Sequence, residues 1–270
     1  MAARLWLAGK ANTVPKRTDG IVESIRLLRV ARASAVKARS ATLVQLSELI
    51  ITTPQALRER LSDRKTIRGK AALCRRLRPE LDALDRPAQA AKLALRSLAR
   101  RIDALDAEIA ELDAQLEQLV RTAAPRTTQL LGVSTGHAGQ LLVTAGQNIE
   151  RLRGDGAFAA LCGASPIPAS SGRTTRHRLN YGGDRNANRA LHMIAVCRLR
   201  YCDRTRAYAQ RRTAEGKTKR EIIRCLKRYI AREAYHALRA DLADLQPQQP
   251  AAAVAITCSA GFIGRHHRKL

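Results

Sequence analysis

The sequence contains few aromatic residues. They make up 3% of its 270 residues, with one Trp, two Phe and five Tyr. Proteins that bind single-stranded nucleic acid commonly stack successive bases on aromatic side chains. The composition therefore argues against an extended stacking platform of that kind.

Closely spaced metal ligands and long apolar runs are also missing. The six cysteines form no CxxC pair and the six histidines are scattered, which argues against a zinc site. We interpret Cys197 and Cys202 as core thiols rather than ligands. No run approaches the roughly 20 apolar residues of a membrane helix, and no secretory signal is present. We expect a cytoplasmic protein with no membrane contact.

Acidic residues are strongly outnumbered. The chain has 49 Lys and Arg against 23 Asp and Glu, a net charge of +26, and a sequence pI near 11.2. Such a chain repels itself unless a polyanion neutralises it, and nucleic acid gains affinity by releasing counterions. A GC-rich genome would explain Arg in place of Lys, but not a twofold excess of bases over acids. The charge therefore predicts nucleic-acid binding.

Helical periodicity dominates the chain, and no alternating strand pattern of useful length occurs, so the sequence predicts an all-α fold. We divide it into a basic helical region (1–85), a coiled-coil rod (86–124), a C-terminal domain (125–242) and a flexible tail (243–270). Asp19 is expected to cap a long helix and Pro54 to open a short one. The basic stripe of the long helix consists of Arg26, Arg29, Arg32, Lys37 and Arg39. Helices are expected in the C-terminal domain at 137–146, 155–162, 186–202, 204–214 and 218–240.

A heptad repeat runs through residues 95–119. Its members are Leu95, Leu98, Ile102, Leu105, Ile109, Leu112, Leu116 and Leu119. Ile and Leu at the a positions with Leu at every d position favour a two-stranded coiled coil, so we expect homo-oligomerisation through 95–119. Packing inside one bundle is the alternative. The outer positions of the heptad repeat are acidic, so we expect this helix to act as a spacer that does not contact phosphate.

A glycine turn precedes the first helix of the C-terminal domain, in "LLGVSTGHAGQLL" (130–142). Gly132 and Gly136 allow the positive φ angles of a tight hairpin. The turn resembles a helix–hairpin–helix element, which binds phosphate at a helix N-terminus, although Ser134 replaces the second glycine of the usual G-x-G. We assign Gly132 and Gly136 to nucleic-acid binding.

The segment "SPIPASSGRTTRHRLNYGGDRNANRAL" (165–191) combines hydroxyl and guanidinium groups. Pro166 and Pro168 prevent a helix, and Ser170 and Ser171 precede Gly172 on the predicted loop. The arginines that follow are Arg173, Arg176, Arg178, Arg185 and Arg189. A serine becomes a useful nucleophile where neighbouring charges stabilise the transition state. The alternative is that these groups only bind backbone phosphate, and composition alone does not separate the two.

The order of several segments resembles one transposase family. The stretch from "LLGVSTGHAGQLL" through "PIPASSG", "NYGGDRNANRAL" and "KTKREIIRCLKRYI" is similar to the C-terminal domain of the DEDD-plus-serine insertion-sequence transposases. These are the bridge-RNA-guided recombinases of insertion sequence one-ten. In that family a serine that precedes glycine becomes linked to DNA. Gly163, Pro166, Ser171 and Gly172 match the layout, so the resemblance implies Ser171 as nucleophile, with the adjacent Ser170 as fallback.

The resemblance implies DNA transposition by site-specific recombination, with DNA and a guide RNA as partners. From proximity and charge, we expect Arg173, Arg176 and Arg178 to hold the reacting phosphate. Arg185 and Arg189 are expected to contact the backbone further along.

The family also has an N-terminal RuvC-like domain whose four acids bind divalent metal. Before Arg60 this chain offers only Asp19, Glu23, Glu48 and Glu59. We therefore expect a chain that lacks this domain and binds no cofactor itself, with Mg²⁺ entering only through the RuvC-like domain. The alternatives are an inactive transposase remnant that only binds nucleic acid, and a structural RNA-binding protein without recombinase ancestry.

Overall fold

The computed structural model describes residues 8, 14–170, 177–178 and 180–245. The predicted all-α fold is confirmed in these residues, whose only sheet is a pair of two-residue strands. The first half of the chain forms α2 (Gly20–Thr52), α3 (Gln55–Ser62), α4 (Ile67–Arg75), the 3-10 turn η1 (Leu81–Ala83) and α5 (Pro87–Ala123). The second half forms α6 (Pro125–Gln129), α7 (Thr135–Ala145), η2 (Ile149–Arg151), α8 (Asp155–Leu161), β1 (Ile167–Pro168), β2 (His177–Arg178), α9 (Arg185–Tyr201), α10 (Asp203–Ala214) and α11 (Lys219–Asp244).

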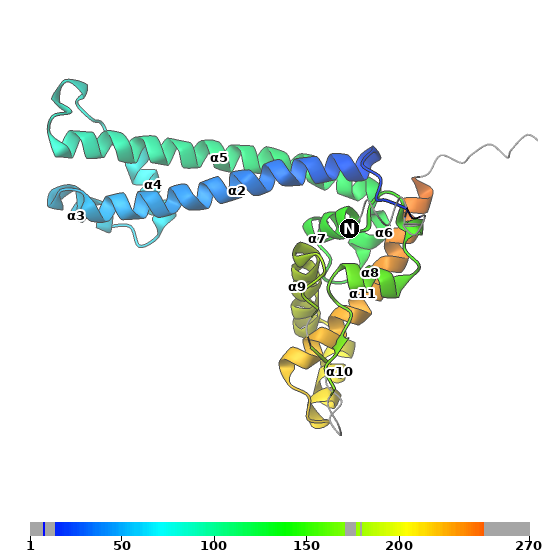
Figure 1. Cartoon of the computed structure of the whole chain (residues 1–270). Coiled ribbons are helices and arrows are strands. Elements are labelled where there is room, and N and C mark those ends of the chain that lie inside the picture. Colours follow the sequence, from blue (N-terminus) through cyan, green and yellow to red (C-terminus); the bar gives the residue numbers. More distant parts are fainter. Residues whose placement is uncertain (1–7, 9–13, 171–176, 179, 246–270) are drawn as a thin grey trace, which may run out of the picture.

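Helices α2 and α5 form a long antiparallel hairpin that projects from the C-terminal helices (Figure 1). The heptad positions Leu95 and Ile102 are buried with Leu46 and Ile50 of α2. At the other end of the hairpin, Leu116 is buried in the core that also contains the start of α2. Apolar residues at this spacing therefore pack inside one chain, which is the alternative to a coiled coil between chains. Oligomerisation through 95–119 stays a prediction.

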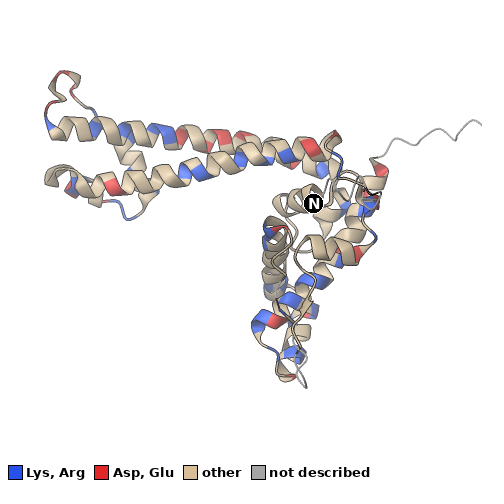
Figure 2. Ribbon diagram, viewed as in Figure 1, with Lys and Arg blue, Asp and Glu red and all other residues tan. Residues whose placement is uncertain are grey.

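The expected basic stripe and the expected acidic face meet each other across this hairpin (Figure 2). Arg32 pairs with Asp113, and Arg39 pairs with Asp106. Exposed ion pairs each stabilise a fold by only about 0–1 kcal/mol, but opposite charges in matching positions favour one register of the two helices. These two arginines of the stripe therefore act within the chain.

Further contacts within the chain also hold charged groups of the hairpin. The carboxylate of Asp103 on α5 accepts from Arg75 of α4 at 2.7 Å. Arg29 donates to the Gly136 carbonyl at 3.0 Å and to Gln140 Oε1 at 2.7 Å.

The long helix does begin after Asp19, but the Asp19 side chain makes no capping bond and binds Arg17 instead.

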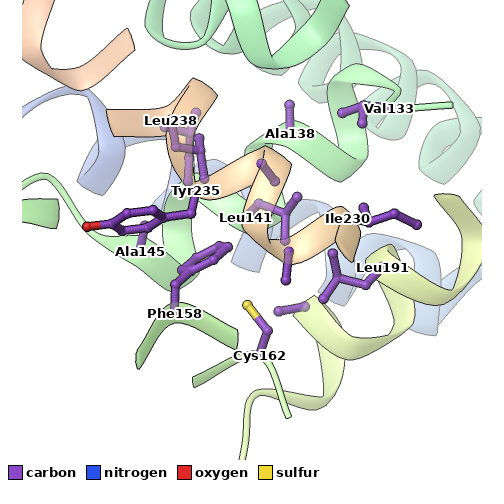
Figure 3. Packing of buried hydrophobic residues seen from close by; sticks show 14 of the residues in the cluster. Val133, Ala138, Leu141, Ala145, Phe158, Cys162, Leu191, Ile230, Tyr235 and Leu238 are labelled. Atoms are coloured by element: carbon purple, nitrogen blue, oxygen red, sulfur yellow. The ribbon is translucent and has the colours of Figure 1, made fainter. Parts of the chain in front are cut away.

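The main core lies among α7, α8, α9 and α11, together with the adjoining ends of α2 and α5 (Figure 3). Phe158 is fully buried there, and its ring centroid lies 6.0 Å from that of Tyr235. A second, separate core joins α3 and α4 to the far part of the hairpin. The C-terminal helices thus form a packed unit without help from that far end.

A buried carboxylate ties α6 to the end of α11. Asp241 is 1% exposed and accepts from the backbone N–H groups of Arg126 and Thr127, both at 3.0 Å. It also accepts from the Thr127 hydroxyl at 2.7 Å. A carboxylate supplied from a distant helix therefore satisfies the free N–H groups at the start of α6.

Candidate nucleic-acid interface

The serine segment leaves the main core and returns to it at one point. Gly163 has a φ angle of +64°, and Gly183 approaches so closely that a Cβ there would lie 2.2 Å from the Gly163 nitrogen. The Asp184 N–H donates to the Leu161 carbonyl at 2.8 Å. The described residues between Gly163 and Gly183 (164–170, 177–178 and 180–182) therefore leave and rejoin the core at one close contact between two glycines. We call this part of the chain the arm and the glycine contact its neck.

Within the arm, β1 and β2 pair in antiparallel register, with Ile167 opposite Arg178 and Pro168 opposite His177. Ser170 follows β1 and is exposed. Ser171, Gly172, Arg173 and Arg176 lie between the strands in the sequence but outside the described residues.

Asn188 of α9 holds the neck. Its amide Nδ2 donates to the carbonyls of Cys162 at 3.0 Å and Gly163 at 2.9 Å. Its Oδ1 accepts from the Lys227 ammonium of α11 at 2.7 Å. Lys227 is 5% exposed, and burial, followed by repulsion from Arg224, lowers its pKa from the usual value. The arm is thus anchored on a buried cation.

A cavity of about 510 Å³ opens between the arm, α10 and α11. We call it the arm cavity. Its basic lining residues are His177, Arg178, Arg211, Arg212, Lys217, Arg224, Lys227 and Arg228, against one acid, Glu221.

Some of these bases are neutralised by nearby acids. Arg228 pairs with Asp155 at 3.1 Å, and Arg212 pairs with Glu215. Arg224 lies 3.9 Å from a carboxylate oxygen of Glu221.

The remaining bases of the arm cavity have no acidic partner. Every Asp and Glu of the chain lies within the described residues. No carboxylate of these residues forms an ion pair with Arg178, Arg211, Lys217 or Lys227. The arm cavity therefore has an excess of positive charge suited to an anion.

A second cavity of about 1030 Å³ adjoins it among α9, α10 and α11. Arg198, Arg204, Arg211 and Arg232 line it, against one acid, Glu233, which pairs with Arg198 at 2.5 Å. Tyr208, Arg211 and Tyr229 line both cavities, so the tyrosine pair forms the ridge between them.

The structure separates the arginines that the sequence grouped together. Arg178 lines the arm cavity, whereas Arg185 and Arg189 are exposed on α9 and line neither cavity. No motif in the sequence singles out the lining residues of α10 and α11. The signal that could have indicated them is local charge, since 19 Lys and Arg stand against five Asp and Glu between residues 160 and 239.

The glycine turn is only partly as predicted. Gly132 has a φ angle of +80° and packs against the Cys197 side chain. Gly136 instead lies in the first turn of α7 without a positive φ, so that part of the prediction is wrong. Ser134 caps the N-terminus of α7. Its Oγ accepts from the His137 N–H at 3.3 Å, and its own N–H donates to His137 Nδ1 at 3.4 Å. This capping box satisfies donors that the hypothesis reserved for phosphate.

The described residues contain neither a metal-ligand cluster nor a membrane-spanning helix. No group of three or more His, Cys, Asp or Glu side chains could hold a metal ion. Hydropathy along the described helices nowhere reaches what an α-helical membrane span requires.

Comparison with known proteins points to mobile elements. Residues 124–210, which contain the arm, α9 and most of α10, match the model of the Transposase IS116/IS110/IS902 family. The chain is also 27% identical over 172 residues to the insertion element IS900 uncharacterized 42 kDa protein of Mycobacterium paratuberculosis. That alignment covers 62% of this chain and 42% of the relative, so the chain spans less than half of the relative's length. In the segment that carries the arm, this chain is therefore similar to insertion-sequence transposases.

Proposed function

We propose that this chain binds DNA through the arm cavity and takes part in the transposition of an insertion sequence. The observation that carries the proposal is a buried lysine without a carboxylate partner, Lys227, which lines a cationic cavity. This cavity opens beside the arm, and the arm lies in the segment 124–210 that matches the transposase family model. Removing an ammonium from water costs several kcal/mol unless an opposite charge compensates it. A DNA phosphate would supply that charge and accept charge-assisted hydrogen bonds from the unpaired bases.

The arm carries the proposed chemistry. Ser171 Oγ would attack a backbone phosphorus, forming a serine–phosphate ester as one phosphodiester P–O bond breaks and the departing oxygen takes up a proton. Arg173, Arg176 and Arg178 would bind the non-bridging oxygens and stabilise the charge that develops on them. Arg178 lines the cavity, which supports its part in this assignment. Ser170 is the alternative nucleophile, because it is adjacent.

Divalent metal belongs to the RuvC-like domain in the family that the sequence resembles. We assign no residue of this chain to Mg²⁺ and expect the ion to act through such a domain, where it would stabilise charge on the reacting phosphate.

Two partner assignments complete the proposal. The first is a guide RNA. The chain has a net charge of +26, and its Lys and Arg side chains would neutralise RNA phosphates and gain affinity by releasing their counterions. The second is a further copy of the chain, bound through residues 95–119. Leu105, Ile109 and Leu112 are only half-buried in the α2–α5 hairpin, which leaves apolar surface in the middle of the heptad repeat for another helix.

A covalent-capture assay tests the chemistry. The chain, alone and with a separately expressed RuvC-like domain, is incubated with element-end DNA, guide RNA and Mg²⁺, then denatured and run on a gel. We expect a protein–DNA adduct that persists in Ser170→Ala and disappears in Ser171→Ala. An adduct lost only in Ser170→Ala would transfer the role to Ser170. Tight binding with no adduct would overturn the serine chemistry and favour a chain that only binds nucleic acid.

A further inference from the structure

The few aromatic residues of this chain are concentrated in one region. All five tyrosines lie between residues 181 and 235. Tyr229 is 58% exposed, although a large apolar ring usually gains free energy when it is buried. It lies on the ridge between the two basic cavities and lines both. An exposed ring in this position is open to a flat ligand whose charged groups reach both cavities.

The surroundings of Tyr229 fix the ring. Its neighbour Tyr208 meets it edge-on, with centroids 5.8 Å apart and an interplanar angle of 83°. Tyr208 in turn lies under the guanidinium groups of Arg211 and Arg212, 5.5 and 6.0 Å from its centroid. Tyr208 is therefore already engaged within the protein, whereas Tyr229 presents the exposed aromatic surface.

We propose that Tyr229 stacks on an unpaired nucleobase while the phosphates on either side of that base occupy the two cavities. This inference rests on the proposed function and specifies the form of nucleic acid that the site prefers. A base inside a continuous duplex is already stacked on its neighbours and cannot cover a protein ring. A bulged, flipped or single-stranded base can do so. The chain should therefore prefer nucleic acid with an extruded base over a fully paired duplex.

A single ring serves a single base, so the proposal is compatible with the low aromatic content. Loss of one base–aromatic stack weakens binding by about 5- to 150-fold in proteins that stack bases on aromatic side chains. The expected preference for an extruded base lies within that range.

The test uses oligonucleotide duplexes that carry 2-aminopurine, whose fluorescence falls when it stacks. One duplex holds the analogue in a one-base bulge, and the other holds it fully paired. Each duplex is prepared once as DNA and once as RNA, which identifies the kind of nucleic acid that supplies the stacked base. With wild-type protein we expect tighter binding of the bulged form and quenching of the bulged analogue. Tyr229→Ala should lose both effects, and Tyr229→Phe should keep them because it retains the ring.

Tyr201→Ala is the matched control. Tyr201 is 65% exposed and also lies beside an arginine, with Arg200 5.3 Å from its centroid, but it lines neither cavity. It should bind and quench as wild type does. Equal binding of bulged and paired duplexes by the wild type, or unchanged preference in Tyr229→Ala, would overturn the stacking proposal while leaving the proposed function intact. Failure to bind either duplex would overturn the proposed function itself.

Discussion

Neutralising the unpaired bases of the arm cavity should weaken DNA binding by a calculable amount. Arg178, Arg211 and Lys217 line the cavity and have no carboxylate partner. Replacing all three with Gln removes three positive charges and leaves the buried Lys227 in place. Arg178 and Arg211 are exposed and Lys217 is half-buried, so the variant should fold normally.

The magnitude follows from counterion release. Each phosphate that a protein neutralises on duplex DNA contributes about 0.9 to the slope of log K against log salt concentration. If each of the three bases contacts one phosphate, the slope of the triple variant is lower by about 2.7. Relative to about 1 M salt, this corresponds at about 0.1 M to roughly an eightfold loss of affinity per residue and roughly 500-fold for all three.

The assay is fluorescence anisotropy of a labelled duplex, titrated at several salt concentrations. The matched control neutralises Arg64, Lys65 and Arg68, which are exposed near the far end of the hairpin and line neither cavity. It removes the same charge and should change the slope little. The reasoning would be refuted if the cavity variant kept the wild-type slope, or if the control lost as much affinity.

Three further predictions concern stability and the arm. Asp241→Ala removes three hydrogen bonds to a buried carboxylate and should lower the free energy of unfolding by about 3–5 kcal/mol. Urea titrations followed by circular dichroism measure this loss. Asp244→Ala is the control, because Asp244 is exposed and its loss should change the free energy of unfolding little. Gly183→Ala would place a Cβ 2.2 Å from the Gly163 nitrogen. We therefore expect the free energy of unfolding to fall by about 1–3 kcal/mol in the same titrations, and proteolysis of the arm to become faster. Gly182→Ala is the control, because a Cβ at Gly182 would meet only a side-chain oxygen at 3.3 Å. Burial lowers the pKa of Lys227, so the folded chain releases this proton before the unfolded chain does, and the cost of the buried charge disappears as pH rises towards 10.5. Wild-type protein should therefore gain stability relative to Lys227→Met as pH rises towards 10.5, measured in urea titrations at successive pH values. A stability difference that stays constant with pH would contradict this.

Local chemistry allowed most helices to be predicted from the sequence. The helix expected at 186–202 is α9, Arg185–Tyr201, because Asp184 caps its N-terminus through the N–H groups of Asn186 and Ala187. The helix expected at 86–124 is α5, Pro87–Ala123, which begins at one proline and ends before the next, Pro125, because proline suits the first turn of a helix and disrupts its interior. These signals act within a few residues of the chain, so they can be recognised without a fold.

The partners of each surface depend on contacts between distant segments. Heptad spacing at Leu95 and Ile102 predicts an apolar seam, but apolar side chains pack equally well on a second chain or on α2. Likewise, the excess of Arg and Lys predicts an anion partner for the C-terminal domain without indicating a site. Arg185 and Arg189 follow the serine segment closely in sequence yet lie outside the cavity.

Tertiary structure alone brings α10 and α11 beside the arm, and with them Arg211 and Lys217, more than 30 residues further along the chain than Arg178. It also leaves Lys227 without a carboxylate partner and Tyr229 exposed between two basic cavities. The sequence by itself determined the helices, their apolar faces and the sign of the charge, because these depend on neighbouring residues. The site was decided by the way those helices pack.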